Sequence, residues 1–240
     1  MDSLLTLPLG GYRSVELMLR MVVALIAMMA LLLGFSTLCV TPRFRFPFIF
    51  SSVALLGAAW FESGVWIAWK EAFELAGTSY CVTGQLLAPE DRIIAWSIGV
   101  PALLGSFALL GKPRGSHGGN ALERLLQIPI LLILLALLAP SSSVMALLIL
   151  GLLGWMIWRP WPENLFFRHL RAAHACIVVP FLITLLGSWH WLPLGREAGK
   201  ILIRGEVIQS LCTLIALLAP AVILLIGVLN ASSKESEASR

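Results

Sequence analysis

Apolar runs separated by short polar connectors follow one another along almost the whole chain. A helix needs about 20 predominantly apolar residues to cross a membrane. Runs near this length predict seven transmembrane helices, at about 15–40, 47–69, 93–111, 125–140, 142–158, 172–189 and 205–229. The pattern therefore predicts an all-α, seven-transmembrane-helix bundle that forms a single domain over residues 1–229, with a disordered cytoplasmic tail at 230–240.

The composition excludes a water-soluble protein. Of the 240 residues, 59% are hydrophobic and only 12% are charged, whereas soluble domains have about 25% charged residues. The four cysteines and four histidines show neither CxxC nor HxxxH spacing, so we expect no metal site. The basic residues lie in connectors beside the apolar runs, and we therefore expect the lipid bilayer, and no nucleic acid, as a partner.

The basic residues also predict an orientation. The connectors 41–46, 112–124 and 159–171, together with the tail, hold ten lysines and arginines, and the opposite side holds seven. Cytoplasmic loops carry the excess of positive charge. We therefore expect a protein of the plasma (bacterial inner) membrane, with its N-terminus outside and its C-terminus in the cytoplasm.

Few ionisable side chains interrupt the apolar runs. Such a side chain costs a few kcal/mol in hydrocarbon, so it needs a partner. Glu62 lies inside the second run and Arg92 opens the third. They predict a buried ion pair, although Arg92 could instead extend to the membrane interface.

Tryptophans and prolines add two further expectations. Trp60 and Trp96 fall deep in their spans and are predicted to face an interior pocket, whereas Trp66 and Trp69 fit an aromatic belt at the interface. Pro101 and Pro180 each interrupt a predicted helix and bend it.

The segment Arg92-Ile-Ile-Ala-Trp96-Ser-Ile-Gly-Val-Pro101 resembles the third helix of the microbial rhodopsins, whose pattern is Arg-Tyr-x-Asp-Trp-x-x-Thr-x-Pro. The segment Val179-Pro180, followed by an apolar turn and Gly187, resembles the sixth helix. Gly57-Ala-Ala-Trp60 is similar to the second helix of the proteorhodopsin and xanthorhodopsin branch. The resemblance implies a microbial-rhodopsin-like bundle around a chromophore pocket.

Carried onto this chain position by position, the resemblance implies a vestigial pocket that has lost its chemistry. Ala95 and Thr213 stand where the family has its two aspartates, and Ser106 stands where the proton-pumping branch has a carboxylate donor. Leu217 takes the place of the retinal lysine. The implied pocket residues are Trp96, Gly99, Val100, Pro101, Cys176, Val179, Pro180 and Leu217.

A retinal Schiff base needs a lysine amine inside the bundle. The four lysines lie in loops, span ends or the tail, at positions 70, 112, 200 and 234. We therefore expect no covalent cofactor and no light-driven proton pumping. Neither do we expect an enzyme, because the sequence has no GxSxG, HExxH or P-loop motif.

Three functions remain open after the sequence is considered. The first is an opsin-like protein that acts as a binding, chaperone or assembly partner in the membrane, as a homo-oligomer or hetero-oligomer. The second is non-covalent binding of retinal or a carotenoid in the old pocket. The third is transport of a small solute or ion along a path that uses Glu62 and Arg92.

Overall fold

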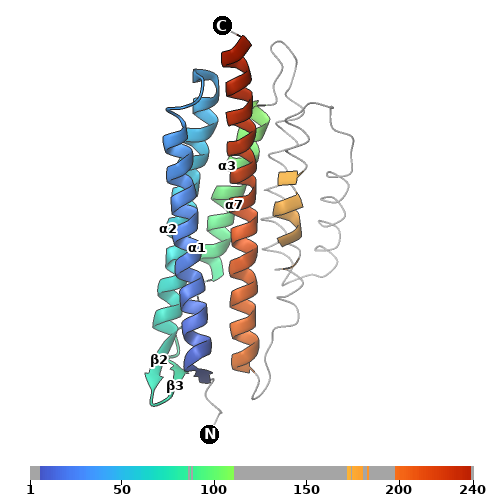
Figure 1. Ribbon diagram of the computed structural model, residues 1–240. Coiled ribbons are helices and arrows are strands. Elements are labelled where there is room, and N and C mark those ends of the chain that lie inside the picture. Colours follow the sequence, from blue (N-terminus) through green and yellow to red (C-terminus); the bar gives the residue numbers. More distant parts are fainter. Residues whose placement is uncertain are drawn as a thin grey trace.

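The computed structural model describes residues 6–85, 87, 89–110, 172, 173, 175–180, 183 and 198–238. Within these residues, four long helices run side by side and a small sheet lies at one end of them (Figure 1). The elements are β1 (Thr6–Pro8), α1 (Leu9–Ser36), α2 (Pro42–Ala72), β2 (Phe73–Ala76), β3 (Ser79–Val82), α3 (Pro89–Leu110) and α7 (Ala198–Ala238).

The predicted spans and the observed helices agree in place but differ at their ends. The span expected at 15–40 is helical over Leu9–Ser36, and the one expected at 47–69 is helical over Pro42–Ala72. The spans expected at 125–140 and 142–158 lie outside the described residues, as does most of 172–189. Among the described helices, three are long and apolar enough to cross a membrane: Leu9–Ser36, Pro42–Ala72 and Gly199–Lys234.

A regular stripe along α1 packs against the other helices. Its buried residues recur every three or four positions, which places them on one helical face. This face contacts α2 and α7, while α2 also packs against α3. The opposite face of α1 exposes leucines, methionines and a phenylalanine, as expected of a surface that meets lipid. The buried residues of α1 are Tyr12, Val15, Leu19, Val22, Ile26, Ala30 and Leu33.

Small polar side chains bring the helices into close contact. The Ser52 hydroxyl donates a hydrogen bond of 2.7 Å to the backbone carbonyl of Ala30, which ties α2 to α1. Ser51 on α2 and Ser106 on α3 are both fully buried, and their hydroxyl oxygens are 2.8 Å apart. In a membrane, where lipid is as apolar as leucine, small residues and such hydrogen bonds favour helix association.

A three-stranded antiparallel sheet, with the strand order β1-β3-β2, was not predicted from the sequence. Thr6 pairs with Cys81, and Phe73 pairs with Val82. The turn between β2 and β3 contains Gly77, whose φ of +67° favours glycine. Strands of three or four residues are too short to produce a recognisable alternation of polar and apolar positions.

An aromatic cluster lies beneath this sheet. The ring of Tyr12 stacks on Tyr80, with centroids 3.7 Å apart, and on Trp69, with centroids 5.8 Å apart. Trp69 is only 1% exposed, so its predicted place in an interfacial belt is wrong. Phe73 contacts both Tyr12 and Trp69. The cluster therefore joins α1, α2 and the sheet through aromatic ring contacts.

Helix α7 corrects the expectation of a disordered tail for residues 230–238. The helix continues to Ala238, and the hydroxyl of buried Ser232 accepts a hydrogen bond of 3.1 Å from the backbone N–H of Thr41. Extending an existing helix needs no new nucleation, and the alanines, glutamates and lysine of this segment favour helix. Polarity alone therefore gave the wrong prediction for this segment.

Candidate functional site

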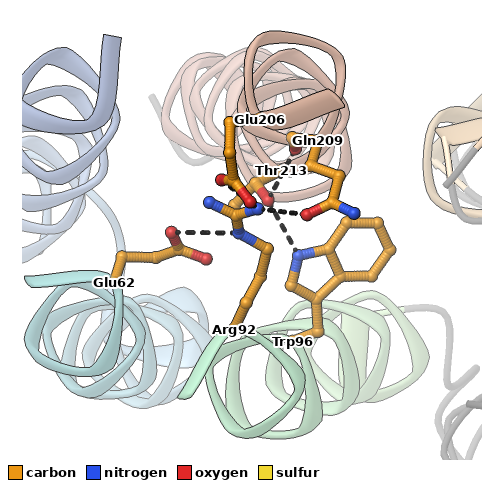
Figure 2. A network of polar contacts seen from close by, with 6 residues as sticks. All are labelled: Glu62, Arg92, Trp96, Glu206, Gln209 and Thr213. Carbon is orange, nitrogen blue, oxygen red and sulfur yellow. Dashed lines mark hydrogen bonds and ion pairs between the residues drawn. The ribbon is translucent and has the colours of Figure 1, made fainter. Parts of the chain in front are cut away.

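Charged and polar side chains from α2, α3 and α7 meet around Arg92 (Figure 2). One guanidinium nitrogen, Nη1, donates hydrogen bonds of 2.6 Å to Gln209 Oε1 and 3.2 Å to Glu206 Oε2. A second nitrogen, Nε, lies 3.6 Å from Glu62 Oε2. Arg92 is 7% exposed and Glu62 is 1% exposed. The structure thus brings together the two residues predicted as an ion pair and adds two partners from α7.

Helical spacing explains how these side chains converge. One face of α7 carries Glu206 together with Gln209 and Thr213, which follow it by three and seven positions. On α3, Arg92 and Trp96 are one turn apart and point toward that face (Figure 2). Trp96 Nε1 donates a hydrogen bond of 3.1 Å to the Thr213 hydroxyl, which donates one of 3.0 Å to the Gln209 carbonyl. The polar contacts therefore continue from the charges toward the middle of the bundle.

Glu62 differs from its neighbours in its hydrogen bonding. Neither of its carboxylate oxygens has a hydrogen-bond partner within the described part of the chain, although Arg92 lies close by. Its neighbour Asp91 packs its carboxylate against Gly64, where a Cβ would collide with it. Glu62 is therefore buried, and its carboxylate has no hydrogen bond from the described residues.

Glu206 and Gln209 were not predicted from the sequence as partners of Arg92. Their spacing with Thr213 was a usable signal, because three polar side chains on one face of an otherwise apolar helix require an interior partner. The alternative in which Arg92 extends to the interface does not fit its burial.

Where α3 and α7 border the implied pocket, side chains of the two helices pack together. Leu217 is fully buried, and its Cδ2 atom would lie 2.6 Å from a Cβ placed on Gly99. Ala95 and Val100 are also buried. The missing side chain of Gly99 therefore provides the space that Leu217 fills between α3 and α7.

The segment that resembles the sixth helix places one predicted pocket residue, Val179, away from the interior. Ala173, Ile177 and Pro180 are buried and lie four and three positions apart, so they define the inward face. Val179 is 53% exposed and lies off this face, whereas Cys176 is half-buried. The prediction that Val179 lines the pocket is therefore wrong in this structure.

The two tryptophans predicted to lie in the interior differ. Trp96 is 9% exposed and packs against Cys212 and Ala216 of α7. Trp60 is 75% exposed and points away from the bundle, which corrects that prediction. Depth along a helix does not determine which way a side chain faces, because successive residues differ by about 100° around the axis.

At the positions of the implied aspartates and donor, the structure has small buried residues. Ser106 bonds to Ser51 and lies within hydrogen-bond distance of the carbonyls of Ala102 and Pro47, at 2.8 and 3.1 Å. The Thr213 hydroxyl accepts a hydrogen bond from Trp96 Nε1, and Ala95 is apolar. Pro101 is half-buried on α3. In the described ranges, no three His, Cys, Asp or Glu side chains form a group that could hold a metal ion.

The lysines of the described helices lie near helix ends. Lys70 is in the last turn of α2, while Lys200 and Lys234 lie near the two ends of α7. Each lysine of α7 is 17 residues from Leu217 (217 − 200 and 234 − 217), or about 25 Å along the helix axis. Lys112 lies outside the described residues.

Comparison with known proteins identifies the fold. The chain is similar to xanthorhodopsin, described as a light-driven ion pump with dual chromophore, with 19% identity, coverage of 98% of this chain and 99% of the other, and a TM-score of 0.78. A thermophilic rhodopsin gives 18% identity, coverage of 97% and 99%, and a TM-score of 0.80. A blue light-absorbing proteorhodopsin from Med12 gives 14% identity, coverage of 93% and 99%, and a TM-score of 0.62.

No protein-family model and no curated protein matches the sequence. At these identities, the structural likeness identifies an architecture. It agrees with the helix arrangement, the long apolar spans and the third-helix resemblance described above. The chain is therefore an integral membrane protein with the seven-helix fold of the microbial rhodopsins.

Proposed function

We propose that this chain is an opsin-fold protein of the proteorhodopsin and xanthorhodopsin branch that forms no retinal Schiff base and acts in the membrane as a binding, chaperone or assembly partner. The observation that carries the proposal is Leu217, which is fully buried against Gly99 at the position that the resemblance assigns to the lysine. An aliphatic side chain there provides packing but no nucleophile.

The residues around Leu217 support the loss of the chromophore chemistry. A protonated Schiff base is a buried cation, and it needs a carboxylate nearby. Ala95 is apolar, and the Thr213 hydroxyl is engaged by Trp96. Arg92, the remaining cation of this region, has its own carboxylates in Glu62 and Glu206. Arg92 therefore has carboxylate partners without a chromophore.

Two alternative functions have less support. Non-covalent retinal or carotenoid would have to compete with Leu217 for the space beside Gly99. Transport through Glu62 and Arg92 would need polar groups that continue across the bundle. Among the described residues, the buried polar side chains beyond Thr213 in the direction away from the sheet are serines: Ser51, Ser52, Ser106 and Ser232.

The chromophore part of the proposal is tested by adding all-trans retinal to the purified protein. We expect no visible absorption band that hydroxylamine bleaches, because an imine is required for that reaction. A retinal-binding microbial rhodopsin prepared in parallel is the positive control. A hydroxylamine-sensitive visible band in this protein would refute the proposal.

The partner part is tested by cross-linking in intact membranes, followed by mass spectrometry of the purified complexes. We expect a complex of defined composition, with this chain or with another membrane protein. Recovery of the monomer alone, under conditions in which a known membrane oligomer is captured, would contradict an assembly role.

The proposed orientation can be tested with the chain's own thiols. Cys39 is exposed in the connector between α1 and α2, and Cys81 lies in β3 at the opposite end. With the N-terminus outside, a membrane-impermeant maleimide should label Cys81 in intact cells and Cys39 only after lysis. Single-cysteine variants, with the other thiols replaced by serine, make the two sites distinguishable.

A further inference from the structure

Glu62, Arg92 and Glu206 form a cluster of charged residues that contains more acidic than basic groups. Arg92 supplies one positive charge, whereas Glu62 and Glu206 would supply two negative charges if both were ionised. An uncompensated charge in a dry interior is strongly unfavourable, and such a group usually becomes neutral instead. Charge balance therefore requires one additional positive charge, for which a proton is the smallest carrier.

The contacts distinguish the two carboxyl groups. Glu206 accepts a hydrogen bond from Arg92 Nη1, and its side chain is 14% exposed. Glu62 is within 3.6 Å of Arg92 Nε, but neither of its oxygens has a hydrogen-bond partner among the described residues, and its side chain is fully buried. A carboxylate is stabilised by donated hydrogen bonds, which Glu206 has and Glu62 lacks.

From this asymmetry we infer that the cluster is a proton-binding site, in which Glu62 holds one proton as a neutral carboxylic acid while Arg92 and ionised Glu206 form the ion pair. Binding is a simple protonation: a proton from water bonds to a Glu62 carboxylate oxygen, and no other bond breaks. The inference is independent of whether the chain binds retinal.

The surroundings of Glu62 agree with a neutral acid. Among the described residues, the charged groups that act on it are Arg92 and Asp91 on α3 and Glu206 on α7. On α1, Glu16 and Arg20 pair with each other at 2.5 Å, and Arg20 lies over Trp66, one turn from Glu62 toward the sheet. These nearby residues include more acids than bases, so the additional proton is favoured.

The route of the proton to Glu62 is limited by packing. Toward the sheet, Val65 and Trp69 of α2 belong to a buried apolar cluster with Leu19. Glu206 and Gln209 are only partly buried, and they lie on the side of Arg92 that faces α7. Among the described residues, the less buried approach to Glu62 is therefore the one past Glu206.

Infrared spectroscopy of the full-length protein at neutral pH, in micelles of a detergent that contains no ester group, provides the test. A protonated carboxylic acid has a carbonyl-stretch band that is separate from the amide bands and shifts in heavy water. We expect this band in the unmodified protein, at a different frequency in Glu62→Asp and at the same frequency in Glu206→Asp. Glu16→Gln, which alters the Glu16–Arg20 pair outside the cluster, should leave the band unchanged.

A second variant tests the charge balance itself. In Arg92→Gln, both buried acids lose their cation and should become neutral, so the band should grow about twofold. Absence of the band from the unmodified protein would overturn the inference without the need for any variant. A band that moves in Glu206→Asp but not in Glu62→Asp, or in neither, would also overturn it, because the proton would then lie elsewhere.

Discussion

Two neighbouring regions between α3 and α7 have opposite characters. In one of them, a polar network joins Arg92 to Glu62, Glu206 and Gln209 on the neighbouring helices. Around Gly99, seven residues or about 10 Å further along α3, the contact with α7 is made by the aliphatic side chain of Leu217. The fold supports both arrangements, because a helical bundle requires complementary packing but no specific chemistry at its centre.

The difference shows where each region obtains its stability. The apolar region is stabilised by the fit of Leu217 against Gly99, which has no Cβ. Substitutions that change the side-chain volume should therefore destabilise the protein there. In the charged region each charge is compensated by a partner of opposite sign. Removing one partner should therefore lower the free energy of unfolding by more than the whole network contributes to it. The two regions should therefore respond differently to substitution.

Replacing the central cation should have the largest effect. Arg92→Met should destabilise the protein by about 3–5 kcal/mol, because Glu206 loses its ion-pair partner and must take up a proton or remain as an unpaired charge. The measurement is reversible unfolding in mixed detergent micelles. The double variant Arg92→Met with Glu206→Gln should recover part of the loss, and strictly additive effects would show that the two residues are not coupled.

Filling the space at Gly99 should have the next largest effect. Gly99→Ala places a Cβ 2.6 Å from Leu217 Cδ2, and overpacking of this kind costs about 1–3 kcal/mol. Gly57→Ala is the matched control, because a Cβ there would meet Ile98 at an ordinary 3.6 Å. If both glycine variants unfold at the same denaturant concentration, the packing between Gly99 and Leu217 is not the constraint that we describe.

The serine pair between α2 and α3 should have a moderate effect. Ser106→Ala removes the hydroxyl that lies 2.8 Å from Ser51 Oγ in a fully buried setting. We expect a loss of about 1 kcal/mol, since a buried hydroxyl then lacks a partner. The double variant with Ser51→Ala should cost less than the sum of the single variants. Additive losses would contradict the bond.

The helical extension of α7 should be the least sensitive region. Ser232→Ala removes the acceptor for the Thr41 N–H and should cost at most about 1 kcal/mol. Its clearest sign should be faster hydrogen exchange at residues 230–238, with exchange near Arg92 unchanged. Rapid exchange of 230–238 in the unmodified protein would instead favour the disordered tail that the sequence suggests.

Long apolar helices could be predicted from sequence because the thickness of the bilayer fixes their length. The proximity of Glu62 and Arg92 could also be hypothesised, since each buried charge needs a partner. The rotation of each helix about its own axis, which decides the side chains that face inward, could not be predicted in this way. Val179 and Trp60 were therefore assigned to the wrong faces, and the face of α7 that carries Glu206 and Gln209 was overlooked. The short strands of the sheet depend on tertiary contacts that leave no periodic pattern.

The central claim is that the chain has the frame of an opsin without its covalent chemistry, and chemical trapping tests it most directly. The 26.1 kDa protein would be incubated with all-trans retinal and reduced with borohydride, which converts any imine into a stable amine. We expect the intact mass to remain that of the unmodified protein. A stoichiometric retinyl adduct, mapped by peptide analysis to any of the four lysines, would contradict the account.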